Sequence, residues 1–150
     1  MNGLEQGLAD YLLNLPKHCE EKNLAEFPST GGKVELDLFS NDRREKFILT
    51  ISQKNVVLYY TFQTRARNCY VLARLDYGAP HLNPDGTRIG SPHLHIYREE
   101  YGDRYAIELP KEIFSKKENP IQTFQDFLNF CKVVGTLPVS YTHLTLPTKA

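Results

Sequence analysis

The sequence has few of the residues that mark fibrous, low-complexity or membrane proteins. It contains no tryptophan, one methionine, nine glycines and nine prolines in 150 residues, which excludes a collagen-like or glycine-proline-rich chain. Its apolar stretches run for only a few residues, far short of the roughly 20 that a membrane helix needs. The first 15 residues have no basic segment followed by an unbroken apolar one, so they do not resemble a signal peptide. We therefore expect a soluble globular protein without a membrane partner.

The sequence also has few cysteines and no net charge. The three cysteines are odd in number, widely separated and without a CxxC spacing, which argues against a disulfide framework and a cysteine zinc site. We therefore expect a cytoplasmic protein. The 18 basic and 18 acidic side chains give a formal net charge of zero, so the chain lacks the broad positive field of non-specific nucleic-acid binders. Any binding to nucleic acid then requires a local basic surface.

The hydrophobic pattern predicts an α+β fold. Leucines and a tyrosine recur at helical spacing over residues 3–15, and apolar residues recur in the same way over 121–131, after an Asn-Pro pair that can cap a helix. Between them, short runs of alternating polarity predict strands near 33–38, 47–52, 56–64, 70–76, 93–98 and 105–109. We expect an N-terminal helix, a curved antiparallel sheet of about six strands and a C-terminal helix, in one domain spanning 1–137.

The last residues, 138–150, differ from the rest of the chain. Their sequence, PVSYTHLTLPTKA, resembles the translation of a sequencing adapter. It is rich in threonine and proline and has no sustained period, which predicts a weakly structured tail that is dispensable for stability. A natural C-terminal strand is the alternative.

The loop at 76–92 is crowded with glycine, proline, asparagine and aspartate. Asn-Pro-Asp-Gly at 83–86 is a strong turn signal, because proline presets one backbone dihedral and glycine accepts a positive one. His81 lies near the start of this loop, and a predicted strand follows its end. We therefore expect the loop to bring His81 close to that strand.

The strand after the loop carries the motif Pro-His-Leu-His-Ile-Tyr. Alternate residues of a strand share a face, so His93, His95 and Tyr97 are expected to point away from the core. With His81 they can act without a metal ion, one neutral imidazole removing a proton and one imidazolium donating a proton. They can also bind one metal ion, with His81 or Asp76 as a further ligand. Histidines bound only to backbone carbonyls are the structural alternative. We favour the acid–base role, with no cofactor, no metal and His81, His93 and His95 as catalytic residues.

Basic side chains suggest how a substrate could bind. Arg65 and Arg67 continue the polar face of the predicted strand 56–64, and Arg74 and Arg98 lie on neighbouring strands. Guanidinium groups bind phosphate oxygens in pairs, and aromatic rings stack on bases, which is the equipment needed to bind single-stranded RNA. On charge alone, a solvated sheet face explains the pattern equally well. The candidate substrate-binding residues are Arg65, Arg67, Arg74, Arg98 and Tyr97.

Residues 31–132 resemble an uncharacterised family of small bacterial and prophage-encoded proteins. The resemblance rests on the segments TFQTR, RLDYGAPHLNPDG, PHLHIYRE and YGDRYA. Within 76–95, the order of Asp, Ala-Pro-His, a proline-bearing loop and Pro-His-x-His is similar to toxins of the TumE type. That similarity implies action on RNA and a site containing His81, His93 and His95. The chain departs from the toxins by having a single histidine after Pro80.

Two functions follow as hypotheses. In the first, the protein is a ribonuclease-like toxin, in which one histidine activates the ribose 2′-OH, another protonates the leaving oxygen, and an arginine stabilises the phosphorane charge. RNA and a cognate antitoxin would be its partners. In the second, it is a non-catalytic phage accessory module that binds a host protein, and its histidines are structural or hold one zinc ion.

Overall fold

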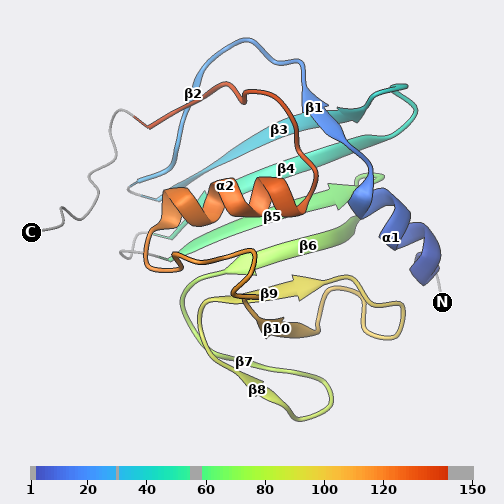
Figure 1. Cartoon of the computed structure of the whole chain (residues 1–150), viewed down its shortest axis with the longest axis vertical. Helices are drawn as coiled ribbons and strands as arrows, with labels where there is room; N and C mark the ends of the chain where they lie inside the picture. Colours follow the sequence, from blue (N-terminus) through green and yellow to red (C-terminus); the bar gives the residue numbers. More distant parts are fainter. Residues whose placement is uncertain (1–2, 30, 55–58, 142–150) are drawn as a thin grey trace, which may run out of the picture.

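The computed structural model describes residues 3–29, 31–54 and 59–141, and the chain folds as the predicted α+β protein (Figure 1). Along this described part the elements are α1 (Gln6–Asn14), β1 (Lys17–Cys19), β2 (Ala25–Glu26), β3 (Gly32–Ser40), β4 (Lys46–Gln53), β5 (Tyr60–Ala66), β6 (Tyr70–Asp76), β7 (His81–Leu82), β8 (Arg88–Ile89), β9 (His93–Ile96), β10 (Ala106–Glu108), α2 (Pro120–Phe130) and β11 (Val139–Ser140). No helix among the described residues is long and apolar enough to cross a membrane.

Seven strands form one sheet in the order β1-β3-β4-β5-β6-β9-β10, and each neighbouring pair is antiparallel. The six predicted strands correspond to β3, β4, β5, β6, β9 and β10. The seventh strand, β1, pairs with the end of β3 at one edge. Its residues, Lys17–Cys19, follow Pro16 directly and show no run of alternating polarity in the sequence. The predicted strand residues at 56–58 lie outside the described part of the chain.

The core lies between this sheet and α2, which crosses β5 in Figure 1. Alternation along β5 directs Phe62 toward the helix, where its ring centre lies 5.0 Å from that of Phe124 and 6.1 Å from that of Phe127. The start of α2 is fixed by Asn119, whose side chain accepts a hydrogen bond from the backbone N–H of Gln122 at 3.2 Å. Pro120 occupies the first turn, so the helix start predicted at the Asn-Pro pair is confirmed.

Residues 138–141 correct the prediction of a weakly structured tail. β11 runs parallel to β2, and the backbone N–H of Phe27 donates to the carbonyl of Ser140 at 2.8 Å. Val139 is buried, and the ring centre of Tyr141 lies 5.3 Å from that of Phe27. Two-residue strands have no detectable period, so the sequence pattern could not show this pairing. Residues 142–150 lie outside the described residues, and the adapter interpretation stays a prediction.

The long loop at 76–92 folds into a small hairpin of β7 and β8, which projects beyond the β9 and β10 side of the sheet (Figure 1). The buried side chain of Asn83 holds this hairpin to β10. Its Oδ1 accepts a hydrogen bond from the backbone N–H of Ala106 at 2.7 Å, and its Nδ2 donates to the Ala106 carbonyl at 2.9 Å. The predicted turn at 83–86 therefore also contributes the anchor of the loop.

Candidate functional site

Three histidines from two elements meet on one side of the sheet. His93 and His95 project from β9, and the hairpin brings His81 over them. The ring centres are 5.0 Å apart for His93 and His95, 5.5 Å for His81 and His93, and 4.7 Å for His81 and His95. The predicted approach of His81 to the other two is confirmed. His93 and His95 are almost fully buried, because the hairpin and the segment before β10 cover them.

Each histidine places one ring nitrogen against a backbone carbonyl. A carbonyl oxygen only accepts hydrogen bonds, so each of these nitrogens carries a proton and donates it. The opposite nitrogen of each ring is left to bind a second proton or a metal ion. One ring nitrogen from each histidine lies within 4.8 Å of the other two. The three carbonyl contacts are His93 Nδ1 with Gly90 at 3.0 Å, His95 Nδ1 with Asp103 at 2.8 Å, and His81 Nε2 with Arg104 at 2.8 Å.

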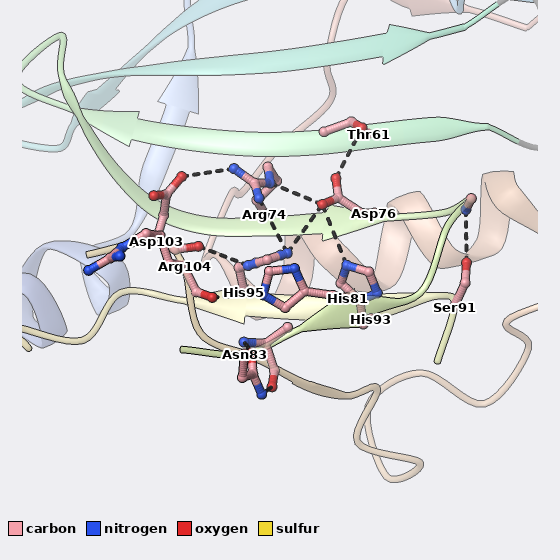
Figure 2. Close-up of polar contacts among 12 residues, drawn as sticks. Thr61, Arg74, Asp76, His81, Asn83, Ser91, His93, His95, Asp103 and Arg104 are labelled. Carbon is pink, nitrogen blue, oxygen red and sulfur yellow. Dashed lines mark hydrogen bonds and ion pairs between the residues drawn. The ribbon is translucent and has the colours of Figure 1, made fainter. Parts of the chain in front are cut away.

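Asp76 lies on β6, directly opposite His93, and its carboxylate faces the histidines (Figure 2). Its Oδ1 accepts a hydrogen bond from the hydroxyl of Thr61 at 3.0 Å. Its Oδ2 accepts a hydrogen bond from Nε of Arg74 at 3.1 Å and lies 3.2 Å from Nε2 of His95 and 3.6 Å from Nε2 of His93. These Nε2 atoms belong to the same rings whose Nδ1 atoms bind carbonyls.

The charge on Asp76 determines what these nitrogens can do. Burial acts to raise the pKa of the carboxyl, but hydrogen bonds from His93 and His95 and the charge of Arg74 outweigh it and hold the pKa well below its usual value. The carboxylate is therefore negative. The Arg74 guanidinium already supplies positive charge here, because it contacts both Asp76 Oδ2 and Nε2 of His95. A proton on an imidazole or a bound metal ion would add to that charge and further offset the carboxylate.

Arg74 is the one predicted substrate-binding residue that lies at the histidines. Its Nη1 donates to the carboxylate of Asp103 at 2.8 Å, and its Nη2 lies 3.3 Å from Nε2 of His95 (Figure 2). With its bond to Asp76, the guanidinium is held by two carboxylates. Asp103 thus contacts Arg74 through its side chain and His95 through its carbonyl. We interpret Arg74 as part of the scaffold of the site.

Arg65 and Arg67 lie away from the histidines. Arg65 is four residues further along β5 than Thr61, a distance of about 13 Å in a strand. It forms an ion pair with Glu35 at 3.3 Å, and Arg67 forms one with Glu45 at 3.0 Å. The strand ends at Ala66, and Arg67 has a positive φ of 53° in the following turn. The predicted continuation of the polar face to Arg67 is therefore wrong.

Tyr97 and Arg98 also differ from expectation. β9 ends at Ile96, so strand alternation does not extend to Tyr97. Its side chain is buried in the core, and its hydroxyl donates to the carbonyl of Leu4 at 2.9 Å. The expectation that Tyr97 points away from the core with the histidines is wrong. Arg98 lies past the end of β9, in a bridge with Gly102, and its guanidinium lies 3.9 Å from the ring centre of Tyr105.

The structure adds residues that sequence reasoning did not assign to the site. Thr61 hydrogen-bonds the carboxylate of Asp76, and Asn83 anchors the hairpin that carries His81. Asp103 pairs with Arg74, and three backbone carbonyls orient the imidazoles. A carbonyl contact leaves no signal in residue type. The turn at 83–86 did signal Asn83, but only as a turn residue.

The comparisons with known proteins now bear on this site. A family model described as a family of unknown function (DUF6978) matches residues 4–133. The chain belongs to this family. The match includes all three histidines, Asp76 and Arg74, and it agrees with the resemblance to an uncharacterised family. Comparison with curated proteins and with solved structures gives no match. The similarity to TumE-type toxins therefore stays a hypothesis.

Proposed function

We propose that this DUF6978 protein binds one divalent transition-metal ion of the zinc class through His81, His93 and His95, and uses it as a hydrolytic centre. The observation that carries the proposal is the orientation of the rings. Each imidazole is held by a carbonyl through one nitrogen, and one ring nitrogen from each lies within 4.8 Å of the other two. The opposite nitrogens of His93 and His95 both face Asp76 Oδ2, at 3.6 Å and 3.2 Å. Metal-bound histidines in proteins are oriented in this way, with the second N–H on a carbonyl or carboxylate.

Asp76 supports the same proposal. Asp76 Oδ2 lies 3.2 Å from Nε2 of His95 and 3.6 Å from Nε2 of His93, next to the three-histidine group. A metal ion bound there would add to the positive charge of Arg74 and further offset the carboxylate. We therefore assign Asp76 as the negative charge beside the ion.

Three protein ligands leave a position for water, as in catalytic zinc sites. Water bound to such an ion ionises near neutral pH. An ion held by the three histidines would supply hydroxide as the nucleophile for hydrolysis of an ester, and the leaving oxygen would take up the proton released by the water. The substrate would be a phosphodiester of RNA, as in the toxin hypothesis from the sequence. In that hypothesis the protein also has an antitoxin partner.

The metal content of the purified protein tests whether the three histidines bind zinc. The protein, stripped with a chelator and dialysed, should take up one zinc ion per chain, and cobalt in its place should give the visible absorption of a tetrahedral nitrogen-ligated ion. His81→Ala and His95→Ala should lose both signals. His81 is half-buried on the hairpin, so its variant should keep the fold. His18→Ala is the matched control, because that histidine lies on β1 and pairs with Glu20. Stoichiometric zinc in the His81→Ala and His95→Ala variants would overturn the proposal.

A metal-independent ribonuclease is the second candidate, and the ion-pair distances from Asp76 to two histidines favour it. The carboxylate would stabilise an imidazolium that acts as general acid, with a neutral histidine as base. RNA cleavage that persists in chelator, in protein with no bound metal, would select this mechanism. Zinc binding without hydrolysis of any ester would instead support the non-catalytic module. Growth arrest on expression, lost in His93→Ala, would support a toxin in either mechanism.

A further inference from the structure

A pocket of about 330 Å³ opens beside the histidines. The end of β4, the start of β5 and the segment that leads into the hairpin form its walls. His81, His93 and Asp76 line one side, Thr61 lies next to them, and Lys54 and Tyr59 line another side. Its volume is at the lower end of the range for small-molecule sites, roughly 300–1,000 Å³. A ligand the size of one nucleotide fits this range better than a long polymer does.

The charges of the pocket favour an anion. Among its lining residues, the charged side chains are Lys54 and Asp76. These two cancel, so a divalent ion on the histidines gives the wall a net positive charge of two. Lys54 is exposed, and no ion pair joins it to a carboxylate in the described part of the chain. A phosphate group can therefore be attracted by the metal and by Lys54 together.

Tyr59 supplies an aromatic surface beside these charges. Its side chain is 38% exposed, and its ring lies against the backbone of Gly78. A Cβ added at Gly78 would lie 3.1 Å from two ring carbons, and Gly78 has a φ of +119°, so glycine is needed there for space and for conformation. The ring thus packs on Gly78 at the pocket wall. A partly exposed tyrosine is a stacking surface for a nucleobase.

We infer that this pocket binds a phosphorylated nucleoside, with its base on Tyr59 and its phosphate between Lys54 and the metal. The inference rests on the proposed function for the positive charge at the histidines. The shared ligand chemistry is a base plus a phosphate monoester, which a free nucleotide and the phosphorylated end of an RNA strand both provide.

Calorimetric titration of the zinc-loaded protein tests the inference with four probes: AMP, adenosine, inorganic phosphate and a 5′-phosphorylated diribonucleotide. AMP should bind more tightly than adenosine or phosphate. Tyr59→Ala should weaken AMP binding by about tenfold or more and leave phosphate binding unchanged, because only the stacking contact is lost. Tyr59→Phe, which keeps a ring, is the matched control. Lys54→Gln should weaken the binding of AMP and of phosphate alike. Zinc content, measured on the same samples, should stay at one ion per chain.

The outcomes separate the two proposals. In protein that contains zinc, equal affinities for AMP and phosphate would overturn the nucleotide inference. Unchanged AMP affinity in Tyr59→Ala would overturn it as well. Absence of zinc from the unmodified protein would overturn the proposed function, whatever binds the pocket. A diribonucleotide that binds more tightly than AMP would identify an RNA end as the ligand, and weaker binding would identify a free nucleotide.

Discussion

Lys17 is a fully buried cation that ties three segments together. Its ammonium donates hydrogen bonds to the carbonyl oxygens of Leu13, Leu15 and Cys131 at 2.7–2.9 Å and lies 4.7 Å from the ring centre of Phe47. The end of α1 and the end of α2 are thus joined through one side chain. Burial lowers the pKa of Lys17 from 10.5 to about 8.

We expect the free energy of unfolding to rise as pH increases from about 8 to 10.5. In this window the unfolded chain retains the lysine proton and the folded chain releases it, so the unfolded state binds more protons and the folded state gains stability. The full difference corresponds to about 3 kcal/mol. Urea unfolding at about pH 7.5, 8.5 and 9.5 measures the rise.

Cys131 has the opposite effect at the upper end of this window. Burial raises the pKa of its thiol from 9.0 to about 11, so in the unfolded chain the thiol ionises first and stability falls. Burial raises the pKa of the Cys19 thiol as well, so the measurement on Lys17 is made with both Cys19→Ala and Cys131→Ala in the chain. A stability that is flat or falls between about pH 8 and 9.5 in that variant would contradict the prediction.

At the same scale, residue type and alternation explain which site residues could be predicted. The shared face of His93 and His95 follows from the two-residue period of a strand, and the prediction held because β9 spans both. The predicted side-chain directions of Tyr97 and Arg67 were wrong for one reason. Each residue lies just past a strand end, where the two-residue period no longer applies. Strand ends depend on packing partners, which the local sequence does not specify.

At the scale of elements, Asn83 controls the hairpin that carries His81. Asn83→Ala would leave the buried backbone N–H and C=O of Ala106 without partners, at a cost of about 2–4 kcal/mol. The hairpin would then lose its anchor, and zinc affinity should fall although Asn83 is not a ligand. Chemical denaturation and zinc titration measure the two effects. Thr87→Ala is the control on the same hairpin, since it removes only the exposed hydrogen bond from the Thr87 hydroxyl to Asp85. Equal stability of the two variants would refute the anchoring role.

The strand β11 makes a second prediction for an element. A chain ending at Leu137 should melt at least about 5 °C below one ending at Tyr141, because the shorter chain loses the pairing with β2 and uncovers Phe27. Differential scanning calorimetry of the two chains provides the comparison. Equal melting temperatures would restore the sequence-based expectation that residues after 137 are dispensable.

At the scale of the whole molecule, the α+β class and six of the seven sheet strands could be predicted, because apolar residues recur in the sequence at helical or strand spacing. The six predicted strands also lie in the sheet in chain order. β7 and β8, which were expected as a loop, form a hairpin outside the main sheet, so β6 pairs with β9. This hairpin creates the site, because it places His81 over His93 and His95, which follow it by 12 and 14 residues in the chain.

This topology also predicts how metal affects the stability of the whole protein. The three histidines meet only when the sheet and the hairpin are both folded, so zinc should bind the folded state far more tightly than the unfolded one. At a free zinc concentration about a thousand times the dissociation constant, binding adds about 4 kcal/mol of stability. In a chain of this size, that corresponds to a rise of roughly 8–16 °C in melting temperature. Thermal unfolding with zinc and then with excess chelator should show the rise and its reversal in the unmodified protein and in His18→Ala, and neither in His95→Ala. A zinc response in His95→Ala as large as that of the unmodified protein would mean that the stabilising ion binds elsewhere.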